Sequence, residues 1–389
     1  MRKPLLALAV SAFGIGTSEF IIMGLLTDIA RSFRVSIPKT GILVSGYALS
    51  VTLGSPLVAL ALSHMDRKRA LLILMGMFTA GNALCALAPT FLLLLLARIL
   101  TALSHGAFFG IGSIVAFHLV PRSERAQAIT LMFTGLTLAN VLGVPAGTAL
   151  GQVFGWRFAF WALVPIGVIA GIGLWRLVPH QAAERFDLKH EFKTVLRPQV
   201  QLVLALSTLS SVSFFCVFTY IAPILEQVTH LSPVAVARVL VIFGVGITLG
   251  NLLGGRLADW KQMPVLLSGF VLLIVIFLIM PFFELSVAPA VVMIFVWGAV
   301  QFGTGSPLQA RVVDQAKGAP NLASTLNQGA FNLGNALGAS FGGILLTEGV
   351  SYRHLSLGSA AVASVALLVG LVALRVERNL TQRDVAVSA

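Results

Sequence analysis

The feature that most constrains this chain is a series of long apolar runs. A helix that crosses a bilayer needs about 20 predominantly apolar residues. Twelve runs meet this length, at residues 5–29, 41–63, 70–88, 91–118, 128–152, 157–178, 201–226, 234–258, 264–283, 286–310, 323–347 and 353–374. Because a helix satisfies its own backbone hydrogen bonds in lipid, the pattern predicts an all-α membrane protein with twelve transmembrane helices.

The composition agrees with a membrane protein and excludes several other classes. Apolar residues make up 57% of the chain and charged residues only 10%, whereas a soluble domain has about 25% charged residues. The net charge of +12 does not indicate a nucleic-acid partner, because the basic residues lie in short loops between the apolar runs. Cys85 and Cys216 both lie inside apolar runs, so we expect neither a disulfide framework nor a metal site.

Motifs that would indicate an enzyme or an ATP-driven pump are absent from the sequence. It contains no G-x-x-x-x-G-K-[ST] phosphate loop, no H-E-x-x-H pair and no G-x-S-x-G elbow. The glycine pairs Gly14-x-Gly16 and Gly244-x-Gly246 lack the strand and the spacing of a dinucleotide site. We therefore expect no cofactor and no enzymatic activity.

One long polar segment, from His180 to Gln199, divides the runs into six and six. The predicted organisation is an N-terminal six-helix bundle (1–178), a cytoplasmic linker (179–200), a C-terminal six-helix bundle (201–375) and a cytoplasmic tail (376–389). The N-terminal apolar run is too long for the apolar region of a signal peptide and carries Glu19 in its middle. It is therefore interpreted as an uncleaved first helix.

The distribution of Lys and Arg predicts the orientation in the membrane. The side with both termini carries 19 of these residues, and the opposite side carries 6. Because basic loops stay in the cytoplasm, we expect both termini to be cytoplasmic in a bacterial inner membrane.

The two halves of the chain also resemble each other. The string FGIGS at 109–113 recurs as FGTGS at 302–306, an offset of 193 residues. The pattern L-x-N-x-L-G at 138–143 recurs at 333–338, an offset of 195 residues. Matches in order and at nearly one offset indicate a six-helix unit that is duplicated in parallel.

Six plus six helices in parallel halves resemble the major facilitator superfamily over nearly the whole chain. Three strings resemble its drug and sugar exporter branch, in particular the bacterial arabinose and sugar efflux permeases: GTSEF at 16–20, SHGAFFG at 104–110 and NVLGVPA at 140–146. The resemblance implies the major facilitator fold, with two six-helix bundles. It also implies export of a sugar-like or drug-like molecule by alternating access.

The same resemblance implies gating residues. The family's loop between helices 2 and 3 is partly present, with Leu62 where its first glycine belongs. In the second copy, at the offset of 193 residues, Trp260 replaces the arginine. The antiporter motif of helix 5 appears in a variant form. The residues that match these motifs are Asp66, Arg67, Arg69, Asp259, Gly143 and Pro145.

Three ionisable residues within predicted helices are candidates for proton coupling. Glu19 is the only acidic residue deep in a predicted helix, where a charge costs about 2.5–3.5 kcal/mol. In an apolar cavity such a carboxyl can exchange a proton near neutral pH, although it could instead be a structural partner for a neighbouring helix. His105 could relay a proton or bind a substrate hydroxyl, but close packing beside Gly106 also explains it. Arg98, which matches an arginine of the family, could tune a nearby carboxylate or anchor its helix at an interface.

Other polar and aromatic side chains within the predicted helices are candidates for binding the substrate. For each aromatic residue, ordinary packing is an open alternative, and each amide could simply bond helix to helix. The complete candidate set is Glu19, Tyr47, His105, Phe109, Asn140, Phe218, Tyr220, Trp297, Gln301, Asn327 and Phe331.

The sequence thus predicts a monomeric secondary transporter that exports a small molecule in exchange for protons. A proton-coupled importer or facilitator of a metabolite such as a sugar or nucleoside would share the same features. A membrane enzyme or receptor is disfavoured, because no large extramembrane module and no converging reactive residues are present.

Overall fold

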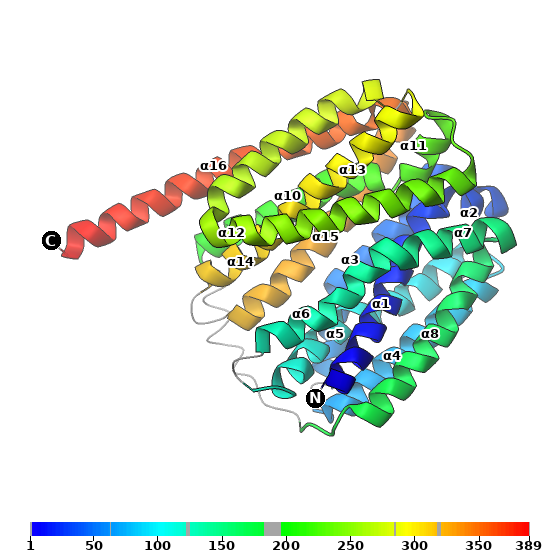
Figure 1. Ribbon diagram of the computed structural model, residues 1–389, viewed down its shortest axis with the longest axis horizontal. Helices are drawn as coiled ribbons and strands as arrows, with labels where there is room; N and C mark the ends of the chain where they lie inside the picture. The colour runs from blue at the N-terminus through cyan, green and yellow to red at the C-terminus, as the bar shows by residue number, and fades with distance from the viewer. Residues whose placement is uncertain are drawn as a thin grey trace.

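The computed structural model describes residues 2–62, 64–121, 125–182, 196–283, 285–316 and 320–388. Within these ranges the regular structure consists of helices. Most of them are long and run roughly side by side along one direction (Figure 1). This arrangement follows from the apolar runs, since each must satisfy its backbone hydrogen bonds internally.

The first six predicted spans all coincide with helices. The first span is α1 with α2, broken at Leu25, and the fifth is α6 and α7 joined by the π-helical turn η2. The elements are α1 (Arg2–Gly24), α2 (Leu26–Phe33), α3 (Ile37–Leu62), α4 (Arg67–Leu87), α5 (Phe91–His118), α6 (Arg125–Leu138), η2 (Ala139–Gly143), α7 (Val144–Phe154) and α8 (Trp156–Leu177).

The last six predicted spans coincide with helices as well, which gives the twelve-helix fold. Two spans share α12, which breaks at Lys261 (φ −153°, ψ 98°), close to Pro264, a residue type that disfavours the helix before it. The elements are α10 (Pro198–Phe218), α11 (Ile221–Gln227), α12 (Pro233–Phe283), α13 (Val287–Gly303), α14 (Gly305–Gln315), α15 (Pro320–Thr347), η3 (Tyr352–His354) and α16 (Leu355–Ser388).

Ten helical stretches of the described chain are long and apolar enough to cross a membrane. The predicted spans 41–63 and 323–347 lie in α3 and α15, two helices in which some side chains are outside the described residues. The two helices pack along each other, and the Thr52 hydroxyl donates to the Gly329 carbonyl at 3.4 Å. Part of their polar surface therefore faces protein.

The helices before and after the polar segment pack mainly within their own half of the chain. In the N-terminal half α4 packs on α5 and α8, and α1 packs on α6 and α8. In the C-terminal half α10 packs on α15 and α16, and α12 folds back on itself and packs on α13. Two seams join the halves, one between α3 and α15 and the other between α12 and the segment of η2 and α7.

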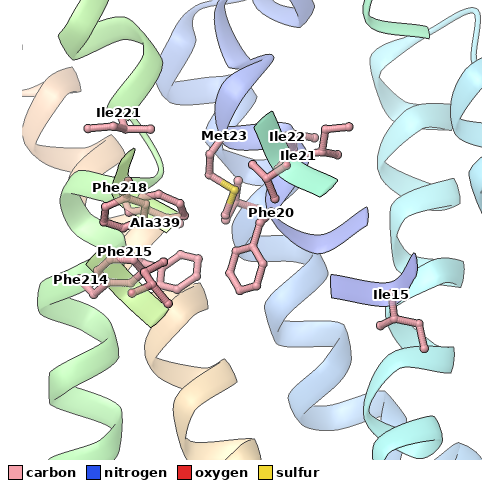
Figure 2. Packing of buried hydrophobic residues seen from close by; sticks show 14 of the residues in the cluster. Ile15, Phe20, Ile21, Ile22, Met23, Phe214, Phe215, Phe218, Ile221 and Ala339 are labelled. Carbon is pink, nitrogen blue, oxygen red and sulfur yellow. The ribbon is translucent and has the colours of Figure 1, made fainter. Parts of the chain in front are cut away.

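Both chain ends lie toward the lower left of Figure 1, and we call this side the terminal face and the other the opposite face. Several contacts between the halves lie toward the opposite face, where α2 meets α11 and α3 begins. Phe20 of α1 lies 6.3 Å, between ring centroids, from both Phe215 and Phe218 of α10. Figure 2 shows Phe20 and Met23 facing these two rings. The halves are thus held together from the opposite face to about mid-depth.

Candidate functional site: a buried cluster around Glu19

The predicted proton-coupling residues Glu19, His105 and Arg98 come together in the N-terminal half. Glu19 lies on α1 and is only 6% exposed. Its Oε2 atom is 3.9 Å from Nδ1 of His105, which α5 contributes. The structure therefore brings a carboxyl and an imidazole close enough to share a proton after a small side-chain movement.

Arg98 lies beside this pair and is completely buried. It precedes His105 by one heptad on α5, which places both side chains on the same face. Its guanidinium donates to the backbone carbonyls of Ser18 and, at 3.3 Å, of Glu19. Its Nε–H has no hydrogen-bond partner among the described residues. A buried cation is costly unless an anion compensates it, and Glu19 is the acidic group nearest at hand.

Tyr47 of α3 closes the cluster. Its hydroxyl lies 3.1 Å from Nδ1 of His105, and its ring stacks 4.1 Å from the guanidinium carbon of Arg98. Tyr47 is therefore held between the cation and the imidazole, and its hydroxyl and Glu19 approach the same nitrogen of His105.

Ser18 and Asn82 support the cluster, and the sequence interpretation missed both. The Ser18 hydroxyl donates to the Asn82 side-chain oxygen at 2.8 Å, and the Asn82 amide donates to the Phe78 carbonyl at 2.8 Å. These bonds tie α1 to α4 next to Glu19. A signal was present in the sequence, since Asn82 is a lone amide in an apolar run.

Phe109 and Asn140 lie on the next turns around the cluster. The Phe109 ring is 5.2 Å from His105 and stacks on Phe133 at 5.1 Å. The Asn140 amide donates to the Leu136 carbonyl within its own helix. Of the substrate candidates, Phe109 thus directly extends the site around Glu19, whereas Asn140 belongs to η2.

Gly143 and Pro145 surround the π-helical turn. The Val144 N–H donates to the Ala139 carbonyl, and Pro145 has no N–H to donate to a carbonyl of the preceding turn. Gly143 packs so tightly on Thr17 of α1 that a Cβ atom would overlap it. The glycine and the proline therefore shape the segment that faces α12 across one seam.

Phe218, Trp297 and Gln301 lie in a separate aromatic cluster of the C-terminal half. Trp297 and Phe218 are fully buried, and each contacts Phe214 and Phe243 at distances of 4.7–5.4 Å between ring centroids. The Gln301 amide donates to the Ser210 hydroxyl at 3.1 Å, and its oxygen has no partner in the described part of the chain. The cluster meets the N-terminal half only where Phe20 reaches Phe215 and Phe218 among the ring contacts described.

The remaining substrate candidates make helix-to-helix contacts in the C-terminal half. The Tyr220 hydroxyl donates to the Ala339 carbonyl at 2.9 Å. The Asn327 amide donates to Gln309 at 2.7 Å and joins α15 to α14. Phe331 packs, partly buried, against the core. These contacts resemble packing more than a site directed at Glu19.

Asp66, Arg67 and Arg69 hold the start of the polar segment. Asp66 caps α4 by accepting the Arg69 N–H at 3.1 Å, and it also accepts the Gln181 N–H at 3.0 Å. Partial burial acts to raise the pKa of Asp66, but these hydrogen bonds and the His180 ring outweigh it and hold the pKa below its usual value.

Arg67 adds a second connection to the polar segment. Its N–H donates to the Gln181 carbonyl at 2.9 Å, and its guanidinium lies 3.1 Å from His118. The side chain of Asp259, the equivalent residue of the second half, lies outside the described residues. Among the described residues no group of three His, Cys, Asp or Glu side chains could hold a metal ion.

Comparison with known proteins shows which family this chain belongs to. Residues 8–327 match the model of the Major Facilitator Superfamily. The inner membrane transport protein YdhP of Escherichia coli (strain K12) is 48% identical over 370 residues, covering 95% of each chain. A chloramphenicol resistance protein of Streptomyces lividans is 32% identical with 95% coverage of each chain, and a probable sugar efflux transporter of Helicobacter pylori (strain ATCC 700392 / 26695) is 31% identical with 88% coverage of each chain.

A solved structure shares the fold. The bacterial homologue of the human lysosomal transporter Spinster, in an inward-facing and unoccupied conformation, superposes with a TM-score of 0.80 over 96% of both chains at 17% identity. The chain is thus a membrane transporter and not an enzyme. It belongs to the major facilitator superfamily and is a multi-pass protein of the bacterial inner membrane that carries a small molecule.

Proposed function

We propose that the protein exports a small molecule in exchange for protons, with Glu19 as the proton site. The observation that carries this proposal is the burial of Glu19 beside His105 and the fully buried Arg98. A carboxyl in this position alternates between a neutral form, which burial favours, and a charged form, which Arg98 favours. An antiporter needs one group that can alternate in this way.

The transport cycle then follows from the two seams. The six-helix halves, 1–178 and 201–375, rock about the central region and expose it to one side at a time. In the described conformation the halves contact each other toward the opposite face, and we propose that the terminal face is cytoplasmic. His105 relays the proton, Phe109 lines the substrate site, and Asp66, Gly143 and Pro145 act in gating.

Export of a sugar-like or drug-like compound agrees with two relatives, a probable sugar efflux transporter and a chloramphenicol resistance protein. A proton-coupled importer or facilitator is the second candidate, because it would use the same buried carboxyl. Everted vesicles separate the two, since an exporter accumulates substrate in them when their lumen is acidic. A thermal-shift screen of pentoses, thiogalactosides, amphenicols and nucleosides identifies the substrate to use.

The proton site is tested with Glu19→Gln, which keeps the size and hydrogen bonding of the side chain but cannot titrate. We expect the variant to fold and to lose at least 90% of the uptake that an imposed pH gradient drives, roughly a tenfold loss. Exchange of labelled substrate without a gradient should persist. The matched control is Glu348→Gln, which makes the same change at an exposed position. Full pH-driven uptake by Glu19→Gln would move the coupling site elsewhere, with His105 as the next candidate.

A further inference from the structure

Tyr47 contacts His105 and Arg98 from α3, and the proposed proton exchange at Glu19 gives it no role. We propose that Tyr47 is a positioning residue that transmits the protonation state of Glu19 to α3, by competing with Glu19 for Nδ1 of His105. This inference rests on the proposed role of Glu19 as the proton site.

The competition follows from the hydrogen-bonding capacity of one atom. The Tyr47 hydroxyl is 3.1 Å and the Glu19 Oε2 atom 3.9 Å from the same nitrogen, Nδ1 of His105. In neutral imidazole that nitrogen carries either a lone pair or a hydrogen, never both. It therefore accepts from Tyr47 or donates to Glu19, but it cannot do both at once.

The two arrangements belong to different protonation states of Glu19. When Glu19 carries its proton, Nδ1 has a lone pair and accepts the Tyr47 O–H, as the 3.1 Å contact indicates. When Glu19 passes its proton to Nδ1, the Nε2 proton of His105 leaves to water. The imidazole stays neutral, the Nδ1–H donates to the new carboxylate, and one proton has been lost in total. Tyr47 then loses its acceptor.

Loss of this bond matters because Tyr47 lies on α3, which forms one of the seams between the halves. On the same helix, Thr52 bonds to the Gly329 carbonyl, and Gly41 packs so closely against the Tyr220 hydroxyl that a Cβ atom would overlap it. The bond between Tyr47 and His105 ties α3 to α5. Proton loss at Glu19 removes this bond and leaves the bond from the Ser55 hydroxyl to the Ala102 carbonyl, so α3, which holds the halves together, is bound less firmly to α5.

The charged surroundings of Tyr47 come from its own half of the chain. Arg98 and His105 of α5 and Glu19 of α1 face it, and Cys85 of α4 is the other titratable neighbour. On the far side of α3, the sequence of α15 contains no residue that titrates. The protonation signal that reaches α3 through Tyr47 therefore originates in the cluster around Glu19.

Tyr47→Phe tests the inference, since it keeps the ring on Arg98 and removes only the hydroxyl. The hydroxyl stabilises the state in which Glu19 is protonated, so its removal lets Glu19 release its proton more readily. We expect the midpoint of Glu19 titration to shift toward acid by roughly half to one pH unit, the worth of one neutral hydrogen bond. The pH dependence of uptake should shift in the same direction.

The readout is the infrared band of the protonated carboxyl, assigned to Glu19 by its absence in Glu19→Gln. Tyr220→Phe is the matched control, because its buried hydroxyl donates to a backbone carbonyl in the other half; its midpoint should stay at the wild-type pH. An unmoved midpoint in folded Tyr47→Phe overturns the inference and leaves the proposed function standing. A carboxyl band that Glu19→Gln does not remove instead contradicts the proposed function.

A second substitution covers the case in which Tyr47→Phe does not fold. The chain has three tyrosines, so 3-fluorotyrosine supplied to the variant with Tyr220→Phe and Tyr352→Phe labels position 47 alone. Fluorine makes the phenol a stronger hydrogen-bond donor, and we expect the midpoint to shift toward higher pH. A midpoint that stays at the value of the unfluorinated double variant, or shifts toward acid, contradicts the inference.

Discussion

At the scale of single residues, the cluster around Glu19 consists of three ionisable groups and the polar side chains that support them. Glu19, Arg98 and His105 stand out because a charge is costly in a bilayer. Ser18 and Asn82, which hold α1 on α4 beside them, do not stand out, because hydroxyls and amides are common in such helices. Which nitrogen of His105 meets Glu19 depends on how three helices pack, and no pattern along one helix encodes that arrangement.

Asp66 gives a prediction at the same scale. Its carboxylate holds the N–H of Gln181 and lies 3.2 Å from the His180 ring. Because its pKa is lowered by these partners, the contact should persist well below neutral pH. The contact should be lost only as the pH falls below 3.8, the ordinary pKa of an aspartate, and then through the lowered pKa of Asp66.

The measurement is hydrogen exchange of the Gln181 amide, followed by mass spectrometry. In Asp66→Asn we expect exchange at neutral pH to be faster by roughly fivefold, since one charge-assisted bond is weakened by about 1 kcal/mol. Asp314→Asn is the control, because Asp314 is also an exposed acceptor of a side-chain bond, from Gln262. Equal protection of Gln181 in wild type and Asp66→Asn would show that the carboxylate does not hold this segment.

At the scale of the elements, apolar run length predicted every span but not the breaks within them. The interruption at Thr304 is followed three residues later by Pro307, which cannot donate to the Gly303 carbonyl. The interruption at Leu25 has no such proline, and its flanking residues are apolar or small. Such breaks depend on what packs against the helix. The π-helical turn was indicated only indirectly by Pro145, whose missing N–H leaves one carbonyl of the turn free.

The seam formed by this turn gives a second prediction. Gly244 of α12 packs on the backbone of Asn140 and Val141, where a Cβ atom would lie 2.8 Å from the Asn140 oxygen. Backbone atoms on both sides cannot move without shifting whole helices. Gly244→Ala should therefore destabilise the described conformation by about 1–3 kcal/mol and shift the population roughly tenfold or more toward the one in which this seam is open.

Spin labels at Ser36 and Ser351, which line a cavity between the halves near the opposite face, report the change. The distance between them should lengthen in Gly244→Ala, in a background in which the two buried cysteines are replaced by alanine. Gly255→Ala is the matched control on the same helix, because a Cβ atom there meets nothing within 4 Å. An unchanged distance distribution in Gly244→Ala would show that this contact does not set the conformation.

At the scale of the whole molecule, the repeats seen in the sequence do not extend to the ionisable groups of the cluster. The repeated strings predicted two halves of similar structure, because small residues that allow close helix packing are present in both. At the offset of 193 residues, the positions of Glu19, Arg98 and His105 are occupied by Val212, Val291 and Gly298. The C-terminal half instead has its aromatic cluster around Trp297. Internal repeats therefore predict the architecture, but they cannot locate the site.

The orientation of the whole molecule decides which way protons move, and it follows from charge on the loops. The sequence segments on the side of both termini contain 19 Lys and Arg residues, and those on the other side contain 6, so we expect both ends in the cytoplasm. Green fluorescent protein fused after Ala389, or inserted between residues 182 and 193, should fluoresce, and alkaline phosphatase at the same sites should be inactive. At His230, in the loop between α11 and α12, we expect the reverse pattern. Active phosphatase after Ala389 would contradict this orientation and place both termini outside the cytoplasm.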